Sequence, residues 1–129
     1  YSPREQVIAV ADHGRVVKAL REELRRRGVD AYNNIHRDLF VPTRDGKDLR
    51  ALFEVKTLSD TGSLYTAIGQ LYFHGLDSTL RVAVLPDDLR EVDRKRLEEL
   101  DIRVVTFSKT STGVSFKGLA PIVAELGKI

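Results

Sequence analysis

The stretch ALFEVKT, residues 51–57, has the composition of a buried strand but carries two unlike charges. Side chains alternate between the two faces of a strand, so Glu54 and Lys56 share one face. Their apolar neighbours Phe53 and Val55 point to the other face. Unpartnered charges are too costly to bury in a folded protein. The pair is therefore either a structural salt bridge or part of a metal-dependent active site.

The composition favours one soluble globular domain that spans residues 1–129. The apolar fraction of 42% and the charged fraction of 31% are enough for a sizeable core under a charged surface. A net charge of +2 is too small to bind nucleic acid by bulk charge alone, but it leaves room for a local basic face. The chain has no cysteine, which excludes disulfide bonds and thiolate metal sites.

The predicted location of the protein rests on its hydropathy pattern. We find no signal peptide and no apolar run of the length that crosses a membrane, so we predict a cytoplasmic protein with no membrane partner. The sequence contains no methionine and opens with YSPRE. We interpret it as a fragment of a longer protein, in which a missing domain holds part of the function.

Hydrophobic periodicity predicts helices that alternate with strands. The first helix is predicted to begin with Asp12 as its N-cap and to end at Gly28. The Asp45-Gly46 pair predicts a tight hairpin turn between two extended segments. The predicted helices lie within residues 11–28, 63–76 and 87–100, and the predicted strands lie within residues 29–43, 49–57, 81–86 and 102–108. Residues 115–126 are predicted to form a turn, with room for a short strand, and then a short helix.

This order of elements predicts an α/β fold with a central mixed β-sheet flanked by helices. The segments 81–86 and 102–108 lack polar alternation, which is typical of parallel inner strands. Large side chains on the second and third helices are assigned to the core rather than to base stacking. This set comprises Leu64, Tyr65, Ile68, Leu71, Tyr72, Phe73, Leu89, Val92, Leu97 and Leu100.

Asp38 is the natural second carboxylate for a metal site that includes Glu54. If the hairpin turns at residues 45–46, residue 38 lies opposite residue 53 or 54, and the two carboxylates fall within reach of one cation. Hard cations such as Mg²⁺ take oxygen ligands and usually keep water and a substrate phosphate in their shells. The backbone carbonyl of Val55 is a further candidate ligand. Lys56 would then polarise the attacking water or stabilise charge on the phosphate.

The constellation of Asp38, Glu54-Val55-Lys56 and a following helix that contains Gln70 resembles the PD-(D/E)XK nuclease superfamily, which has a restriction-endonuclease-like fold. The pattern EVKT followed by AIGQL resembles one branch of it. That branch carries an acidic residue or a histidine near the start of its leading helix, which Asp12 and His13 match loosely. The resemblance covers residues 12–107. It departs from the family in one place, where Arg37 replaces the proline usual before the first acidic residue.

The resemblance implies a metal-dependent endonuclease that hydrolyses phosphodiester bonds in DNA, with Mg²⁺ as cofactor and Mn²⁺ as a substitute. Asp38 and Glu54 would hold the metal together with Val55. Lys56 would assist the water nucleophile, and Gln70 would support the site from the next helix. A restriction or genome-defence cleavage module fits this description. Its base specificity would lie in a missing domain, and a homodimer would allow it to cut both strands.

Several basic residues are candidates for contacts with the nucleic-acid backbone. Arg37 and Arg50 rank highest because they lie on the predicted hairpin near the proposed site. His13 is a further candidate because it lies near the start of the leading helix.

Other functions stay open on the sequence alone. One is a structure-specific nuclease for repair or recombination intermediates, or an RNase. Another is a non-catalytic nucleic-acid-binding module that keeps the fold. A third is an interaction domain in which Glu54 and Lys56 form a structural salt bridge. Gln70 then reads as a solvated or interface glutamine.

Overall fold

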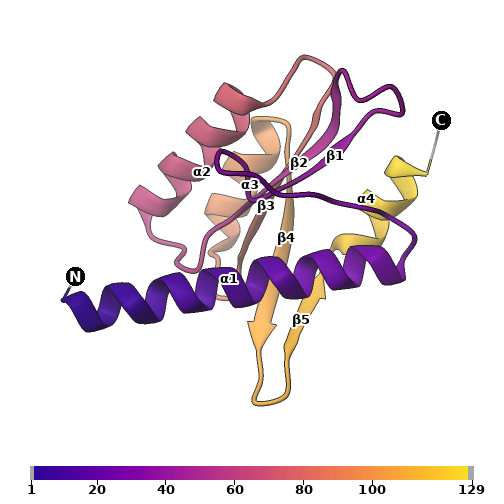
Figure 1. Cartoon of the computed structure of the whole chain (residues 1–129). Helices are drawn as coiled ribbons and strands as arrows, with labels where there is room; N and C mark the ends of the chain where they lie inside the picture. Colours follow the sequence, from indigo (N-terminus) through magenta and orange to yellow (C-terminus); the bar gives the residue numbers. More distant parts are fainter. Residues whose placement is uncertain (1, 128–129) are drawn as a thin grey trace.

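The computed structural model describes residues 2–127, which form four helices and one five-stranded sheet (Figure 1). The elements follow in the order α1 (Pro3–Arg26), β1 (Leu39–Pro42), β2 (Leu49–Val55), α2 (Thr61–His74), β3 (Leu80–Pro86), α3 (Glu91–Glu99), β4 (Ile102–Lys109), β5 (Val114–Lys117) and α4 (Leu119–Leu126).

The strands lie side by side in the order in which they occur in the chain. β1 pairs with β2 and β4 with β5 in antiparallel fashion, whereas β2–β3 and β3–β4 are parallel. The two parallel pairs are joined through α2 and α3, because parallel strands need a crossover connection. The predicted mixed α/β sheet is confirmed, and so is the parallel pairing of segments 81–86 and 102–108.

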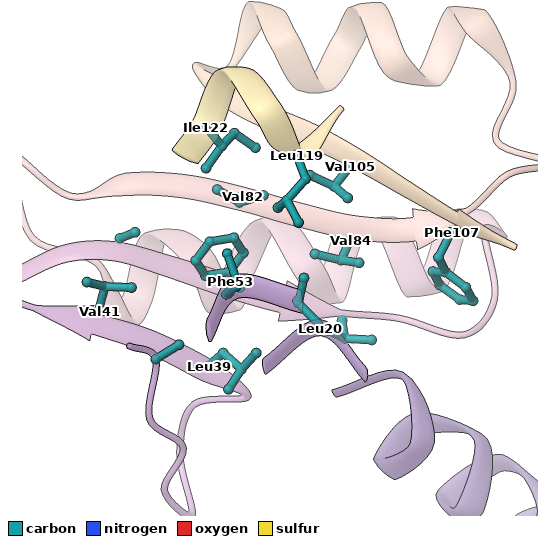
Figure 2. Close-up of a cluster of buried hydrophobic side chains, with 14 of the residues drawn as sticks. Leu20, Leu39, Val41, Phe53, Val82, Val84, Val105, Phe107, Leu119 and Ile122 are labelled. Carbon is teal, nitrogen blue, oxygen red and sulfur yellow. The ribbon is translucent and has the colours of Figure 1, made fainter. Parts of the chain in front are cut away.

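Each face of the sheet buries its own hydrophobic cluster. Phe53 and Val55 point toward α1 and α4 and pack with Leu20 and Ile122 (Figure 2). Leu52 points the other way, into the cluster that α2 and α3 cover. The alternation predicted for this strand is confirmed. It places the Glu54 side of β2 beneath α2 rather than beneath α1, because Leu52 and Glu54 share a face.

Helix α1 begins earlier than its periodicity predicts. Ser2 is its N-cap and accepts a 3.2 Å hydrogen bond from the Glu5 N–H, and Pro3 occupies the first turn. The predicted N-cap at Asp12 is therefore wrong, since Asp12 lies in the middle of the helix. The predicted end is confirmed, because Gly28 follows the C-cap with φ of +86°.

The segment 29–43, predicted to be extended, forms a strand only over β1. Before it, the side chain of Asn34 accepts hydrogen bonds of 2.9 Å from the N–H groups of both His36 and Arg37, which folds this part into a loop. The hairpin is also wider than the predicted two-residue turn, because Thr43 and Asp48 close it. Side chain–backbone bonds thus shape the chain just before the predicted site.

Several large side chains assigned to the core are exposed instead. Phe73 is 85% exposed, Tyr65 71% and Tyr72 44%. The inward side of α2 consists of Leu64, Ala67 and Leu71, and Ile68 packs beside them. Tyr72, one residue further round the helix, uses its hydroxyl to donate to the Leu100 carbonyl.

Helix α3 begins later than predicted, at Glu91. Two of its residues assigned to the core from the hydrophobic pattern are exposed. Leu97 is buried and Leu89 is partly buried against the same cluster. Val92 is 54% exposed and Leu100 is 43% exposed, so their assignment to the core is wrong. A helix this short covers the sheet with one side of only two turns, which leaves its ends in solvent.

Candidate active site

Four of the predicted site residues lie together at one end of the sheet, where β1 begins and β2 ends, and these are Asp38, Glu54, Val55 and Lys56. The register that pairs Leu39 with Phe53 sets Asp38 opposite Glu54. This is the pairing that the sequence predicts. Lys56 follows β2 directly, and its N–H donates to the Val84 carbonyl of β3. The carboxyl end of neighbouring parallel strands is where α/β proteins commonly build their ligand sites.

Asp38 is held from two sides. Its Oδ2 accepts a 2.8 Å hydrogen bond from the backbone N–H of Val55. Its Oδ1 lies 3.1 Å from Nε2 of His13, which projects from α1. These contacts fix the plane of the carboxylate beside Glu54. The sequence predicts two roles for His13, a loose match to the start of the family's leading helix and a contact with the nucleic-acid backbone, but not its contact with Asp38, because nothing local in the sequence shows that α1 crosses this end of the sheet.

Glu54 is the most deeply buried charged group of the site, with 4% of its surface exposed. Its Oε1 lies 3.6 Å from Nζ of Lys56, which is itself partly exposed. Lys56 therefore lies close to Glu54 and stays partly exposed to solvent. A structural salt bridge and a metal site both predict this distance, so the other charges near Glu54 are informative.

Burial, followed by the nearby charge of Asp38, raises the pKa of Glu54 from 4.5 to about 8. Lys56 acts in the opposite direction but does not compensate. Burial on its own would also raise the pKa of Asp38, but the hydrogen bonds from His13 and from the Val55 N–H outweigh it and lower that pKa. Because the pKa of Glu54 is raised to about 8 while that of Asp38 is lowered, the pair retains one proton near neutral pH.

A carboxyl pair retains a proton at neutral pH when too little positive charge lies nearby to stabilise both anions. A bound cation supplies that charge and favours the ionised form of both groups. Within residues 2–127 no cluster of three or more His, Cys, Asp or Glu side chains is suited to hold a metal. The chain thus offers two carboxylates and the neighbouring Val55 carbonyl. This donor set fits Mg²⁺, which usually takes one or two protein carboxylates and completes its shell with water and phosphate.

Gln70 lies on α2, which packs against β2 and β3. Its Oε1 is buried and has no hydrogen-bond partner among the described residues. No hydrogen bond joins it to Asp38, Glu54 or Lys56 within residues 2–127. Its predicted supporting role therefore stays a prediction.

The two arginines predicted to contact nucleic acid lie at different distances from the site. Arg37 directly precedes Asp38, and its Nε is buried without a partner among the described residues. Arg50 is near the start of β2, about 13 Å along the strand from Glu54. Only Arg37 is a neighbour of the carboxyl pair.

Helix α1 is held in place by one ion pair and two hydrogen bonds that the sequence does not predict. Asp12 forms a 2.8 Å ion pair with Lys109 at the end of β4. Arg15 donates to the carbonyls of Thr110 and Gly113, in the turn between β4 and β5. Figure 1 shows this hairpin reaching past α1. These contacts flank His13 and so set its position over Asp38.

Comparisons of the chain with protein-family models, curated proteins and solved structures find no significant match. The geometry of the site is therefore what supports any assignment of function. None of the helices within residues 2–127 has the length and apolar character needed to cross a membrane.

Proposed function

We propose that this chain is the catalytic domain of a metal-dependent endonuclease with a restriction-endonuclease-like fold, which hydrolyses phosphodiester bonds in DNA. The observation that carries the proposal is the geometry of the carboxyl pair: Asp38 stands opposite the buried Glu54, and Nζ of Lys56 lies 3.6 Å from Oε1 of Glu54. A purely structural salt bridge would need one buried carboxylate, not two.

Asp38 and Glu54 would hold Mg²⁺ or Mn²⁺, with the Val55 carbonyl as a third donor. When bound, the ion would neutralise charge on the phosphate and make a water molecule more acidic. The retention of one proton by the carboxyl pair makes its combined charge adjustable, so that two ionised carboxylates are available when a cation is present.

The side chains around the pair have separate tasks in this proposal. His13 and the Val55 N–H keep the Asp38 carboxylate in one orientation. Lys56, beside Glu54, would orient the attacking water and stabilise the charge that develops on the phosphate oxygens. Water adds to phosphorus and loses a proton to solvent, the bond between phosphorus and the leaving oxygen breaks, and the leaving oxygen takes up a proton from solvent.

The biological setting belongs to the same proposal. A restriction or genome-defence enzyme of the cytoplasm would use this domain for cleavage and another domain for base specificity. A homodimer would place two such sites on the two strands. Competition between duplex DNA, branched DNA and RNA substrates distinguishes this setting from repair of DNA structures and from RNA cleavage.

The direct test is cleavage of supercoiled plasmid in Mg²⁺, in Mn²⁺ and in EDTA. Lys56→Ala is the test variant, and Lys95→Ala is its control, because Lys95 is an exposed lysine on α3. We expect nicking that requires metal, is lost in Lys56→Ala and is retained in Lys95→Ala, with all three proteins folded by circular dichroism. Equal cleavage by wild type and folded Lys56→Ala would refute the proposed role of Lys56, and absence of metal-dependent cleavage on any nucleic acid would refute the function.

A further inference from the structure

A surface hollow of about 370 Å³ opens beside the carboxyl pair, between α1 and the loop that precedes β1. Three of the side chains that line it are basic, and these are Lys18, Arg21 and Arg37. His13 and Asp38 form its end nearest the candidate site. The hollow therefore leads away from the site along a surface of local positive charge, although the whole chain carries only +2.

The basic lining is built by two elements that hold it in place. His13, Val17 and Arg21 follow one another at helical spacing, so they lie on one face of α1. Opposite them, the Asn34 side chain accepts a hydrogen bond from the backbone N–H of Arg37, and the Arg37 guanidinium lies over the Phe40 ring, 5.8 Å from its centroid. The hollow thus has walls that exist before any ligand binds.

Each of the two arginines in the hollow, Arg21 and Arg37, has a buried Nε donor without a hydrogen-bond acceptor among the described residues. No carboxylate in residues 2–127 forms an ion pair with either of them, whereas Arg26, Arg27 and Arg90 are all paired on the surface. Buried donors without acceptors are costly, so these two guanidinium groups are suited to a ligand that brings acceptors.

We propose that this hollow is a phosphate-binding subsite, which holds a phosphate group of a nucleic-acid strand a few nucleotides away from the candidate site. Guanidinium groups bind phosphate through paired hydrogen bonds, and two of them facing one hollow favour a doubly or singly charged oxyanion. Arg21 lies about 12 Å from His13 along the axis of α1. A strand would span this distance in a few nucleotides.

Asp38 is the one carboxylate at this hollow, and its charge opposes an anion. It stands at the end next to the site, where His13 contacts its Oδ1 at 3.1 Å. The basic side chains outnumber it and lie further along. The inference rests on the proposed function, since it assigns the direction in which a bound strand leaves the carboxyl pair.

Binding in EDTA tests the subsite separately from cleavage. The probes are short single strands labelled with fluorescein at the 3′ end, with either a 5′-phosphate or a 5′-hydroxyl, and the readout is fluorescence anisotropy. The test variants are the Arg21→Gln/Arg37→Gln double variant and Lys18→Gln, which changes only an exposed side chain. The matched control is Arg96→Gln, an exposed arginine on α3 across the sheet. Melting temperatures show that each variant is folded.

We expect the double variant to weaken binding about tenfold and to lower the slope of log K against log salt by about 1 to 2. Lys18→Gln should weaken binding by a smaller factor, and Arg96→Gln should bind as wild type does. A preference for the 5′-phosphate that disappears in the double variant would identify a terminal phosphate as the ligand. Equal loss for both probes would identify an internal phosphodiester.

Three results would overturn the subsite. These are wild-type affinity in the folded double variant, an equal loss in Arg96→Gln, and no binding of either probe by the wild-type chain. Because no metal is present, loss of binding in the double variant would support the subsite even if the plasmid assay showed no cleavage. If the wild-type chain cleaves plasmid and the double variant binds the probes with wild-type affinity, the nuclease proposal stands and the subsite proposal is refuted.

Discussion

The backbone N–H of Val55 donates a 2.8 Å hydrogen bond to Oδ2 of Asp38. This bond ties the last residue of β2 to the residue that precedes β1, and it sets two carboxyl groups side by side at the end of the sheet. One of them, Glu54, is almost fully buried. Burial beside the Asp38 carboxylate raises the pKa of Glu54, whereas the hydrogen bonds from His13 and the Val55 N–H outweigh burial and lower the pKa of Asp38.

We predict that the unfolding free energy of the wild-type chain falls as pH rises, and that this fall is smaller in Glu54→Gln. The pKa of Glu54 is raised by burial and by Asp38, from 4.5 to about 8, so the folded chain binds this proton more tightly than the unfolded chain does. The stabilisation by this bound proton is complete below about pH 4.5 and disappears as the pH rises to about 8. The slope in this window is at most on the order of 1 kcal/mol per pH unit.

The measurement is urea unfolding of wild type and Glu54→Gln across this pH window in EDTA. The difference between the two proteins isolates the group at position 54, since all other titrating groups are common to both. Glutamine keeps a donor for Asp38 and cannot ionise, so the variant should be the more stable protein above pH 8. A constant difference in unfolding free energy across the window would contradict the raised pKa.

We predict that divalent cations stabilise the chain more strongly as the pH approaches 8. A cation at Asp38 and Glu54 must displace the proton that the pair retains, so binding releases a proton and tightens as the pH rises through the pKa of Glu54, about 8. The measurement is the rise in melting temperature with MnCl₂ or MgCl₂, relative to EDTA, well below and just above that pH. Asp38→Asn should abolish the rise. A rise that persists in Asp38→Asn would place the metal elsewhere.

We predict opposite outcomes for two phenylalanines. Phe53 is fully buried at the centre of the sheet, so Phe53→Ala should cost about 3–5 kcal/mol of unfolding free energy. Phe73 is 85% exposed on α2, and Phe73→Ala should change the unfolding free energy by less than about 0.5 kcal/mol. Chemical denaturation of the two variants measures both effects. A large loss in Phe73→Ala would mean that α2 packs with its other side inward.

We predict that Gly118→Ala destabilises the chain more than Gly28→Ala does. Both glycines have positive φ, +90° and +86°, so each alanine incurs a conformational cost of about 1–2 kcal/mol. A Cβ at position 118 would also come within 3.0 Å of the Val104 carbonyl oxygen, whereas position 28 is open. Thermal unfolding of the two variants compares the sites directly. Equal costs would show that the turn before α4 relaxes away from β4.

The sequence alone determined the α/β sheet and the pairing of Asp38 with Glu54. Both depend on patterns that act over short distances, since alternation sets the faces of a strand and the hairpin brings its two arms into register. Core assignments on α2 and α3 were less secure. A shift of one residue turns a helix by about 100°, so Tyr72 reaches solvent beside the buried Leu71.

Only the tertiary structure decided what surrounds the carboxyl pair. His13 reaches Asp38 because α1 crosses the end of the sheet, held there by the ion pair of Asp12 with Lys109. The hollow lined by Arg21 and Arg37 likewise forms where α1 meets the loop before β1. These contacts join segments far apart in the chain, and their position follows from how whole elements pack. No local spacing of residue types encodes that packing, whereas the succession of predicted elements along the chain and the two faces of β2 follow from periodicity.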